Sequence, residues 1–410
     1  MRVVLIGSGA VGSAIAAIAA RRTFIDRLVV ADVDLLRAQE AAAGAAEGGV
    51  HSFAERIDAS SASDIEALLR RHRADVVVNA CDPRCNPPIF AAAFAAGAQY
   101  LDMAMNLSQP HPTQPYSQLG VPLGEAQTRA SSRWADRGLL ALVGMGADPG
   151  LSQVFARYAA DHLFSRIDEI GVRDGSNLVI EGYEFAPTFS IWTTIEECLN
   201  PPIVYERDRG WFTTEPFSEP EIFDFPEGIG PLECVNVEHE EVLMIPRVLD
   251  VGRVTFKYGL GQDFIEVLRT LHRIGMDGTR RVRVGGVEVA PRDVVAATLP
   301  DPSTLGHRMH GKTCAGTRVR GLGHDGLTRE VFLYSVVDNA DSMREYGCQA
   351  VGWQTAMNPV IALELLASGD WKGVGVLGPE SFDAVPFLAK LEAYGAPHGM
   401  REFGEQLAAA

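Results

Sequence analysis

The feature that most constrains this chain is a glycine loop that follows a short apolar run at the amino terminus. Residues 2–6 read RVVLI, and Gly7-Ser8-Gly9-Ala10-Val11-Gly12 comes directly after them and opens an alanine-rich stretch. Between a strand and a helix, the pattern G-x-G-x-x-G allows a tight turn, close approach of a pyrophosphate and close packing of the two elements. The phosphates would lie at the helix N-terminus, where free N–H groups favour anions. We therefore expect a dinucleotide site formed by Gly7, Gly9, Ala10, Val11 and Gly12.

An acidic side chain follows the second predicted strand, at residues 27–31. Asp32 stands twenty residues after Gly12, where a carboxylate accepts hydrogen bonds from a ribose hydroxyl. Its negative charge would repel a 2′-phosphate, so the sequence favours NAD over NADP. A glycine turn without a ligand is the weaker alternative, because strand, loop, helix and acid occur together.

The first 145 residues alternate apolar runs with stretches of helical periodicity. Predicted strands lie at 2–6, 27–31, 75–80, 99–103 and 139–144, and predicted helices lie at 10–21, 35–43, 62–72, 88–96 and 124–137. This alternation predicts an α/β fold, a Rossmann-type doubly wound parallel sheet with helices on both faces.

The remainder of the chain has a different character and predicts a second, α+β domain with a mixed sheet. Helical patterns occur at 151–162 and 263–274, a hairpin about Gly285-Gly286 at 281–290, and strand-like runs at 210–214, 242–245, 253–258, 317–320 and 330–337. A long apolar helical pattern at 348–367 ends before Gly369. We expect a dinucleotide-binding domain at 1–150, a substrate domain at 151–340, and C-terminal helices at 341–410 that return to the first domain.

Composition excludes several classes of partner. The chain has 36 basic and 53 acidic side chains, a formal charge of −17, whereas nucleic acid or an anionic membrane requires a basic surface. No run of eighteen apolar residues predicts a membrane span, and the first residues lack the pattern of a signal peptide. Six cysteines are too sparse for a disulfide framework. We expect a cytoplasmic protein with reduced thiols and a small-molecule substrate.

A second segment matches the residue pattern of a nucleotide-binding loop but lacks the strand and the helix that should flank it. Gly306 to Thr313 matches G-x-x-x-x-G-K-[ST], but prolines precede it and no helical pattern follows, as a phosphate loop requires. His307, His310 and Cys314 lack an evident fourth ligand for zinc. We predict a loop of the substrate domain here, and no metal site.

Polar residues stand at the carboxyl ends of the predicted parallel strands, where ligands of such sheets bind. Cys81 and Asp82 follow the strand at 75–80 and are candidates for cofactor contacts. Asp102 ends the next strand, and Asp148 follows the last one and opens a helix. Turn formation is the alternative for the Asp-Pro pairs. The position near the expected nicotinamide favours Asp148 as a site residue.

The chain resembles the saccharopine dehydrogenase family. The resemblance rests on the glycine fingerprint, on Gly146-Ala147-Asp148-Pro149-Gly150, which is similar to the family's G-x-D-P-G segment, and on the order of the elements. It implies an inserted mixed-sheet domain that also builds a homodimer or a higher homo-oligomer. In the saccharopine reductases the aspartate of that segment contacts the substrate, and this role carries over to Asp148.

Two further positions are candidate site residues. Residues 254–258, VTFKY, look like the family's T-L-R-[YW] strand, whose arginine holds a substrate carboxylate. The resemblance gives that role to Lys257, and a solvated lysine is the alternative. His239, flanked by acidic residues, is a candidate proton acceptor, although an ordinary surface histidine is the favoured interpretation.

The resemblance and Asp32 together predict an NAD-dependent oxidoreductase acting on the C–N bond of an amino acid, such as lysine or saccharopine. Hydride transfer would pass through an imine, and Asp148 or Asp102 would accept or position the proton of the amine. Two alternatives stay open. One is a carboxynorspermidine dehydrogenase-type imine reductase of polyamine synthesis, which usually draws on NADPH, and the other is a non-catalytic NAD(H) sensor.

Overall fold

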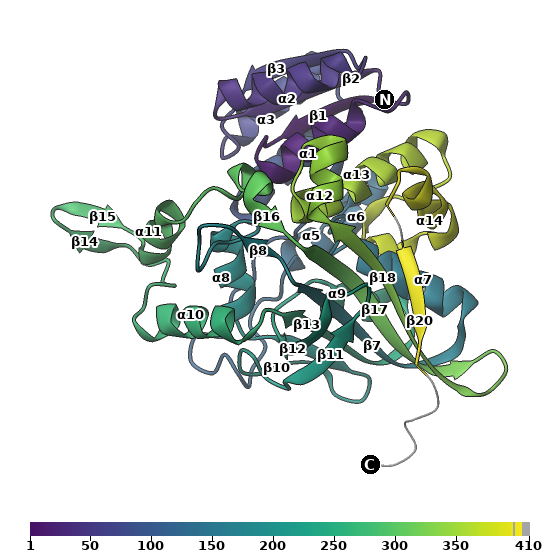
Figure 1. The fold of residues 1–410 in the computed structure, drawn as a ribbon. Coiled ribbons are helices and arrows are strands. Elements are labelled where there is room, and N and C mark those ends of the chain that lie inside the picture. The colour runs from purple at the N-terminus through teal and green to yellow at the C-terminus, as the bar shows by residue number, and fades with distance from the viewer. Residues whose placement is uncertain (397, 404–410) are drawn as a thin grey trace.

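The computed structural model describes residues 1–396 and 398–403, and it contains two large sheets (Figure 1). The first is parallel, with the strand order β19-β6-β5-β4-β1-β2-β3. Its strands are β1 (Arg2–Ile6), β2 (Arg27–Asp32), β3 (Ser52–Arg56), β4 (Val76–Asn79), β5 (Gln99–Asp102), β6 (Leu140–Leu142) and β19 (Gly375–Leu377). The predicted Rossmann-type sheet is confirmed.

Apolar residues along β1 explain why this sheet is covered on both faces. Val3 and Leu5 belong to one buried cluster, whereas Val4 and Ile6 belong to another. Successive side chains of a strand point to opposite faces, so a continuous apolar run requires helices on each side. These helices are α1 (Ala10–Ala19), α2 (Leu35–Glu47), α3 (Ala62–His72), α4 (Asn86–Ala96), α5 (Glu125–Arg129) and α6 (Ser131–Asp136).

The second sheet is mixed, as predicted. Its order is β10-β9-β13-β7-β17-β18-β20, and the hairpin of β11 and β12 joins it through β13. Only β13 and β7 run parallel among these neighbours in the described residues. The strands are β7 (Phe164–Ser176), β9 (Ile203–Glu206), β10 (Gly210–Thr213), β11 (Glu221–Phe225), β12 (Gly230–Asn236), β13 (Val251–Gly259), β17 (Lys312–Gly323), β18 (Thr328–Asp338) and β20 (His398–Glu402).

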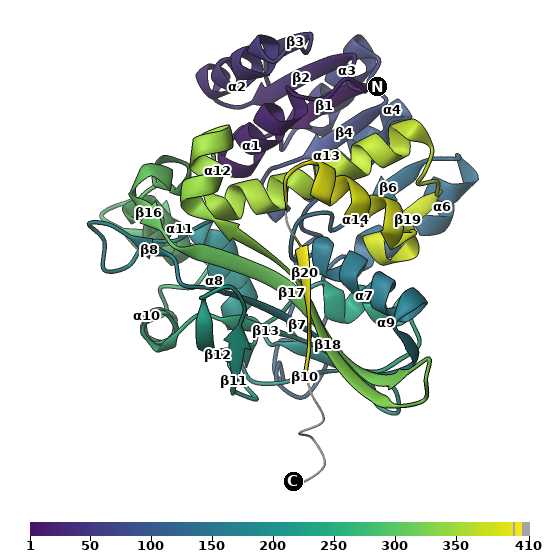
Figure 2. The ribbon, with the colours of Figure 1, turned by 45° about the vertical axis from the view of Figure 1, so that its right-hand side comes forward.

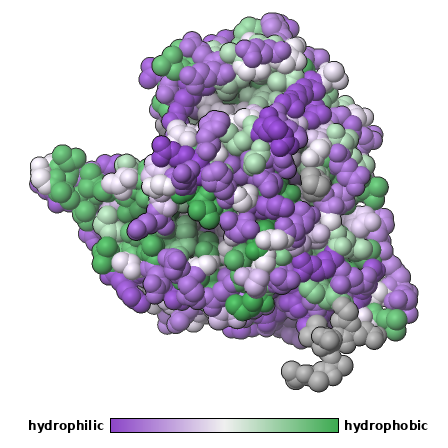
Figure 3. Space-filling model, in the orientation of Figure 1, coloured by the Kyte–Doolittle hydropathy of each residue, from purple (hydrophilic) through white to green (hydrophobic). Residues whose placement is uncertain are grey.

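Helices and one small hairpin complete this part of the chain. The helices are α7 (Leu151–His162), α8 (Ile191–Leu199), α9 (Glu241–Val248), α10 (Gln262–Arg273) and α11 (Pro291–Thr298). The predicted hairpin forms from β14 (Val282–Val284) and β15 (Val287–Val289), and both central glycines have positive φ. It projects from the body of the molecule and leaves Val282, Val284 and Val287 exposed (Figures 1 and 3).

One predicted strand is wrong. Residues 242–245 lie in helix α9, where all four apolar side chains are buried. A short apolar run does not distinguish a buried strand from a buried helical turn. The same run was therefore compatible with both structures, and packing against the mixed sheet decided for the helix.

The motif that resembles a phosphate loop leads into a strand. Gly306–Arg308 forms a single 3₁₀ turn, and Lys312 is the first residue of β17. A phosphate loop needs a helix at this point, because the N–H groups of the helix N-terminus hold the phosphates. The local structure agrees with our rejection of that motif.

The C-terminal segment packs against the amino-terminal part of the chain. It forms α12 (Asn339–Tyr346), α13 (Ala350–Ser368) and α14 (Ala384–Ala393). Helix α13 ends at Gly369 in the left-handed conformation, and it packs along α1 (Figure 2). Strand β19 then pairs with β6 and extends the parallel sheet. Within the described residues, no helix combines the length and apolar character needed to cross a bilayer.

Candidate active site

The glycine loop between β1 and α1 has the geometry that a dinucleotide requires. Gly7 has a φ of +98°, and a Cβ there would lie 2.7 Å from the carbonyl oxygen of Ala80. A Cβ on Gly12 would overlap the carbonyl oxygen of Gly7, whereas the space around a Cβ on Gly9 is open. Gly9 is the N-cap residue of α1, and it has no side chain that could accept hydrogen bonds from the first N–H groups of the helix. The loop therefore leaves both the space and the free N–H groups that a pyrophosphate would use.

Asp32 lies at the edge of this loop. Its Oδ2 accepts hydrogen bonds from the backbone N–H of Ser8 at 2.7 Å and from the Ser8 hydroxyl at 2.9 Å, and Oδ1 accepts from the N–H of Asp34 at 2.9 Å. These bonds fix the carboxylate beside the glycines while the residue stays partly exposed. The position fits the hydroxyl groups of an adenosine ribose.

Cys81 and Asp82 follow β4 next to the same loop. The backbone nitrogen of Cys81 lies 3.1 Å from the place of a Gly7 Cβ, and its thiol lies 3.4 Å from the carbonyl oxygen of Ile6. The Asp82 carboxylate accepts a hydrogen bond from Arg84 Nε at 2.8 Å. Both residues stay candidates for contacts with the cofactor.

A cavity of about 730 Å³ lies between the carboxyl ends of the parallel strands and one face of the mixed sheet. Ala10 and Val11 of the loop contribute to its wall, as do Met103 and Ala104 after β5. Strands β7, β13 and β17 supply Asp174, Tyr258 and Thr313, helix α8 supplies Glu197, and α13 supplies Val351 and Gly352. The cavity therefore begins where the reactive end of a dinucleotide on the loop would lie.

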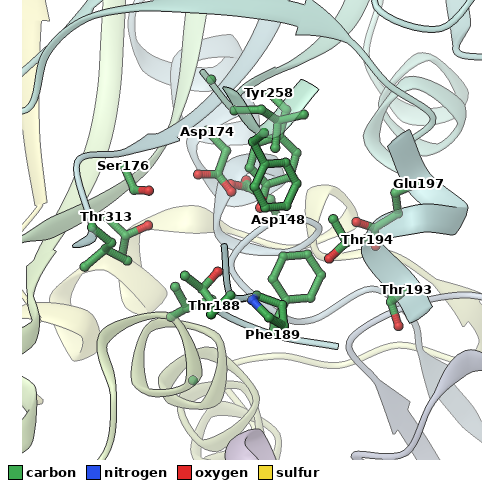
Figure 4. A pocket seen from close by; sticks show the side chains of 18 of the residues that line it. Asp148, Asp174, Ser176, Thr188, Phe189, Thr193, Thr194, Glu197, Tyr258 and Thr313 are labelled. Atoms are coloured by element: carbon green, nitrogen blue, oxygen red, sulfur yellow. The ribbon is translucent and has the colours of Figure 1, made fainter. Parts of the chain in front are cut away.

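Asp148 is placed on the cavity wall by the turn between β6 and α7 (Figure 4). Its two carboxyl oxygens are buried and have no hydrogen-bond partner among the described residues. Burial, together with the charges of Asp174 and Glu241, raises the pKa of Asp148 well above its ordinary value. A buried carboxyl without donors is costly unless a ligand supplies them, and a cationic N–H group would favour the ionised form.

Other carboxyl groups share this environment. Burial is the main cause that raises the pKa of Asp174 to about 7 and that of Glu197 to about 8. Figure 4 shows Asp148, Asp174 and Tyr258 close together, with Glu197 on another side of the cavity. Across the described lining residues there are five acidic side chains and no lysine or arginine: Asp148, Asp174, Glu184, Glu197 and Asp263. This charge distribution favours a cationic ligand.

His239 also lines the cavity, so the prediction of a surface histidine is wrong. The residue is only 3% exposed, and its ring stacks on Phe256 with 3.7 Å between centroids. Nδ1 lies 2.5 Å from Oε2 of Glu241. Burial disfavours the imidazolium, but Glu241, Glu240 and Glu197 outweigh it and raise the pKa of His239 to about 10. The apolar run directly after the acidic residues was the one sequence signal of this burial.

His239, Glu240 and Glu241 lie close enough to hold a metal ion, with ligand atoms within 4.8 Å of one another. However, Oε1 of Glu240 accepts a hydrogen bond from the N–H of Met105 at 2.9 Å, and Oε1 of Glu241 accepts one from the Ser152 hydroxyl at 2.8 Å. Protein donors thus occupy these oxygens. The cluster is better described as a hydrogen-bond network that joins the two parts of the molecule.

The predicted catalytic role of Asp102 requires a correction. Its carboxyl oxygens accept hydrogen bonds from the N–H of Gly144 at 2.7 Å and from Nε2 of Gln127 at 2.8 Å. The residue is 1% exposed and is not part of the cavity wall. Burial raises the pKa of Asp102 to about 7. Asp102 connects β5 to β6 and α5, because the strand end turns its side chain into the protein and away from the substrate space.

Lys257 also requires a correction. On β13 the flanking residues Phe256 and Tyr258 face the His239 ring and the cavity, so Lys257 points to the opposite face of the sheet. There its Nζ lies 3.4 Å from Glu221 and 3.9 Å from Glu219. A substrate in the cavity is out of reach of this side chain, which therefore does not anchor a substrate carboxylate there.

This correction gives a direct prediction. Replacing Lys257 with Met is expected to leave the KM for the substrate within about threefold of wild type, because the ion pairs on the far face do not touch the cavity. Steady-state kinetics on the variant, with its melting temperature recorded in parallel, checks this. A large rise in KM without loss of stability would restore Lys257 as the anchor.

Comparison with known proteins decides the family. Residues 3–142 match the family model of the saccharopine dehydrogenase NADP binding domain, and residues 146–396 match that of the saccharopine dehydrogenase C-terminal domain. The chain belongs to the saccharopine dehydrogenase family. The predicted family is thus confirmed, and the chain is an oxidoreductase with an NAD(P)-binding domain that acts on amine or imine groups.

Relatives within the saccharopine dehydrogenase family differ in their named reactions. The chain is 30% identical over 404 residues to carboxyaminopropylagmatine dehydrogenase of Synechocystis sp., covering 97% of this chain and 96% of that protein. It is 28% identical over 343 residues to carboxynorspermidine synthase of Vibrio cholerae, covering 83% and 81%. The apo saccharopine dehydrogenase (L-Glu forming) of Saccharomyces cerevisiae shares the fold, with a TM-score of 0.68, 14% identity and coverage of 98% and 100%.

Proposed function

We propose that this chain is an NAD(P)-dependent imine reductase that joins a polyamine-type amine to a carbonyl carbon and yields a secondary amine. The observation that carries the proposal is the cavity wall, which holds five acidic side chains and no lysine or arginine among its described residues. Amines and guanidines are cationic at neutral pH, and an acidic, partly desolvated cavity attracts them. The names of two relatives, a carboxyaminopropylagmatine dehydrogenase and a carboxynorspermidine synthase, support the same substrate class.

The same charges argue against the substrate that the sequence favours. Saccharopine carries three carboxylates, whereas a polyamine-type amine carries none and the amino-acid aldehyde that it would join carries one. With Lys257 on the far face, the described cavity wall supplies no lysine or arginine for three carboxylates, and the imidazolium of His239 is already paired with Glu241. Like charges in a low-dielectric site repel strongly. We therefore prefer the polyamine alternative over saccharopine, and the names of the two relatives favour it over lysine.

Asp148 has the main role in this proposal. Its unpartnered oxygens would accept hydrogen bonds from the reacting amine, orient its nitrogen, and take up the proton that the ammonium form must lose before it attacks a carbonyl carbon. Asp174 and Glu197 would hold further positive charge of the same substrate. A bound nicotinamide dinucleotide supplies the hydride that reduces the imine. The protein holds the reacting groups together and excludes water.

A direct assay tests the reaction. The protein is mixed with an α-amino acid that carries a side-chain aldehyde, with agmatine or a linear diamine, and with NADH or NADPH, and the loss of reduced cofactor is followed by absorbance. We expect consumption only when aldehyde and amine are both present, and formation of a secondary amine by mass spectrometry. Turnover with saccharopine or lysine and NAD⁺, but not with the mixtures, would contradict the proposal.

For the cofactor we propose NAD(H), because the Asp32 carboxylate lies at the ribose position. Replacing Asp32 with Asn is expected to weaken NADH binding about tenfold or more and to strengthen NADPH binding, since a charged hydrogen bond contributes roughly 1.5–3 kcal/mol and the repulsion of a 2′-phosphate disappears. Titration of cofactor fluorescence measures both affinities. Asp136→Asn, an exposed position on α6, is the matched control. An unchanged preference in Asp32→Asn would assign the choice of cofactor to other residues.

A further inference from the structure

His239 is the buried titratable group on the cavity wall that the proposed function does not use. Its Nδ1 is engaged by Glu241 at 2.5 Å, and stacking on Phe256, with 3° between the planes, fixes the plane of the ring. No described residue bonds Nε2, and the imidazole lines the cavity. Nε2 is therefore available for a hydrogen bond to a ligand in the cavity.

The partner of this histidine is itself held in place. Glu241 is fully buried, and its second oxygen accepts a hydrogen bond from the Ser152 hydroxyl at 2.8 Å. The neighbouring Glu240 lies 3.5 Å from Nδ1 and is fixed by the N–H of Met105. Ser152 belongs to α7, and Met105 follows β5. Residues from both parts of the molecule thus determine where Nε2 points.

Resting on the proposed function, we propose that His239 is a catalytic proton donor in imine formation and that Glu241 is its positioning residue. The neutral amine nitrogen adds to the aldehyde carbon, the C=O π pair goes to oxygen, and transfer of a proton from nitrogen to that oxygen gives a carbinolamine. The C–O bond then breaks, its electron pair goes to oxygen, and this oxygen takes the proton from Nε2 and leaves as water. The resulting iminium carbon accepts the hydride from the reduced dinucleotide, and the neutral imidazole recovers a proton from solvent. Atoms and charges balance in each step.

The electrostatic surroundings suit an acid. Carboxyl groups face the imidazole from the neighbouring segments: Glu240 directly before α9, Glu241 on α9, Glu197 on α8, Asp174 on β7 and Asp148 before α7, with the Tyr258 hydroxyl on β13. Burial lowers the pKa of His239, but Glu241, Glu240 and Glu197 outweigh it and raise the pKa, so the proton is present at neutral pH. A cationic substrate that enters beside the ring lowers this pKa again and makes the imidazolium a stronger acid.

A purely structural histidine would look different. His72, the last residue of α3, is such a case. It lies away from the cavity, and its Nε2 is 3.0 Å from Oε1 of Glu55 on β3. It is partly buried and has a glutamate partner, as His239 has. His72 therefore provides a matched control, in which a His–Glu pair is altered without a change at the cavity.

The experiment compares His239→Gln with His72→Gln in the aldehyde and amine assay. We expect His239→Gln to lower kcat by about 10²–10⁴-fold, the usual contribution of a general acid, with NADH affinity within twofold of wild type. His72→Gln is expected to keep wild-type kcat. In wild type kcat should decline at alkaline pH as the imidazolium loses its proton, and this decline should be absent from the residual rate of His239→Gln. An equal rate and the same pH profile in both variants would overturn the proposal.

Chemical rescue separates catalysis from structure. Added imidazole is expected to raise the rate of His239→Ala at least tenfold, because the space left against the Phe256 ring accepts free imidazole. Failure of imidazole to raise the rate of a folded, cofactor-binding variant would count against the proposal. If these variants do not fold, Glu241→Gln tests the proposal, because it keeps the shape of the side chain and removes the charge that faces Nδ1. The alkaline decline of kcat should then move to lower pH, and an unchanged pH profile of kcat would contradict the assignment.

The outcomes also separate the two proposals. If wild-type protein consumes no reduced cofactor with any aldehyde and amine mixture, the proposed function fails. If wild type turns over and His239→Gln retains its rate and pH profile, the proposed function stands and only the role of His239 fails.

Discussion

Replacing Asp148 with Asn is expected to lower turnover by about 10²–10⁴-fold while NADH affinity stays within twofold of wild type. The amide keeps the size of the side chain but cannot take a proton from the substrate ammonium. Because the carboxyl oxygens have no protein donor among the described residues, the substitution breaks no described hydrogen bond of the fold. Pre-steady-state and steady-state assays, together with cofactor titration, measure the two effects separately.

Asp136→Asn on α6 serves as the control for this substitution, because it removes a carboxylate far from the cavity. It is expected to keep wild-type turnover. If Asp148→Asn also keeps it, Asp148 has no part in the reaction. A loss of NADH affinity equal to the loss of turnover would instead assign Asp148 to the cofactor site.

The affinity for a cationic amine is expected to rise steeply with pH. Burial raises the pKa of Asp174 to about 7 and that of Glu197 to about 8, and also raises that of Asp148. Below these values the carboxyls are neutral and attract a diamine weakly. As the pH rises they ionise, so the Kd should fall about tenfold per pH unit for each carboxyl that ionises on binding, and it should level off once these groups are ionised in the free protein. One proton should be released for each carboxyl that ionises on binding.

Isothermal titration of a linear diamine, without aldehyde, at several pH values and in two buffers of different ionisation enthalpy measures both affinity and proton release. Glu197→Gln is expected to weaken binding and to remove the part of the dependence near pH 8. Glu47→Gln, at an exposed position on α2, is expected to behave as wild type. A Kd that is independent of pH, or that rises with pH, would show that these carboxyls do not bind the amine.

Much of the dinucleotide-binding half could be predicted from the sequence, because its signals are local. Gly7 and Gly12 meet steric requirements set by the loop itself and by the residues after the adjacent strand, Gly9 keeps the space for a ligand open, and Asp32 follows from the length of one strand–helix–strand unit. Helices α3 and α7 begin and end where their periodicity predicts. Strand β3, SFAER, was missed because an edge strand with few apolar residues carries little signal.

The substrate side could be predicted less well, because its arrangement depends on contacts between distant segments. Lys257 and Tyr258 are neighbours in the chain, yet the pleat of β13 sends one to the far face and the other to the cavity. His239 looked exposed beside three glutamates, and only the packing of α9 against the mixed sheet buries it.

The sequence by itself determined the family, the parallel sheet and the dinucleotide loop, because these depend on short patterns in which each residue is constrained by its near neighbours. Only the tertiary structure decided which carboxyls and which histidine meet in the cavity. Asp148, Asp174, Glu197 and His239 come from four separate segments of the chain, and a charge acquires its chemical character from the burial and the neighbours that folding gives it.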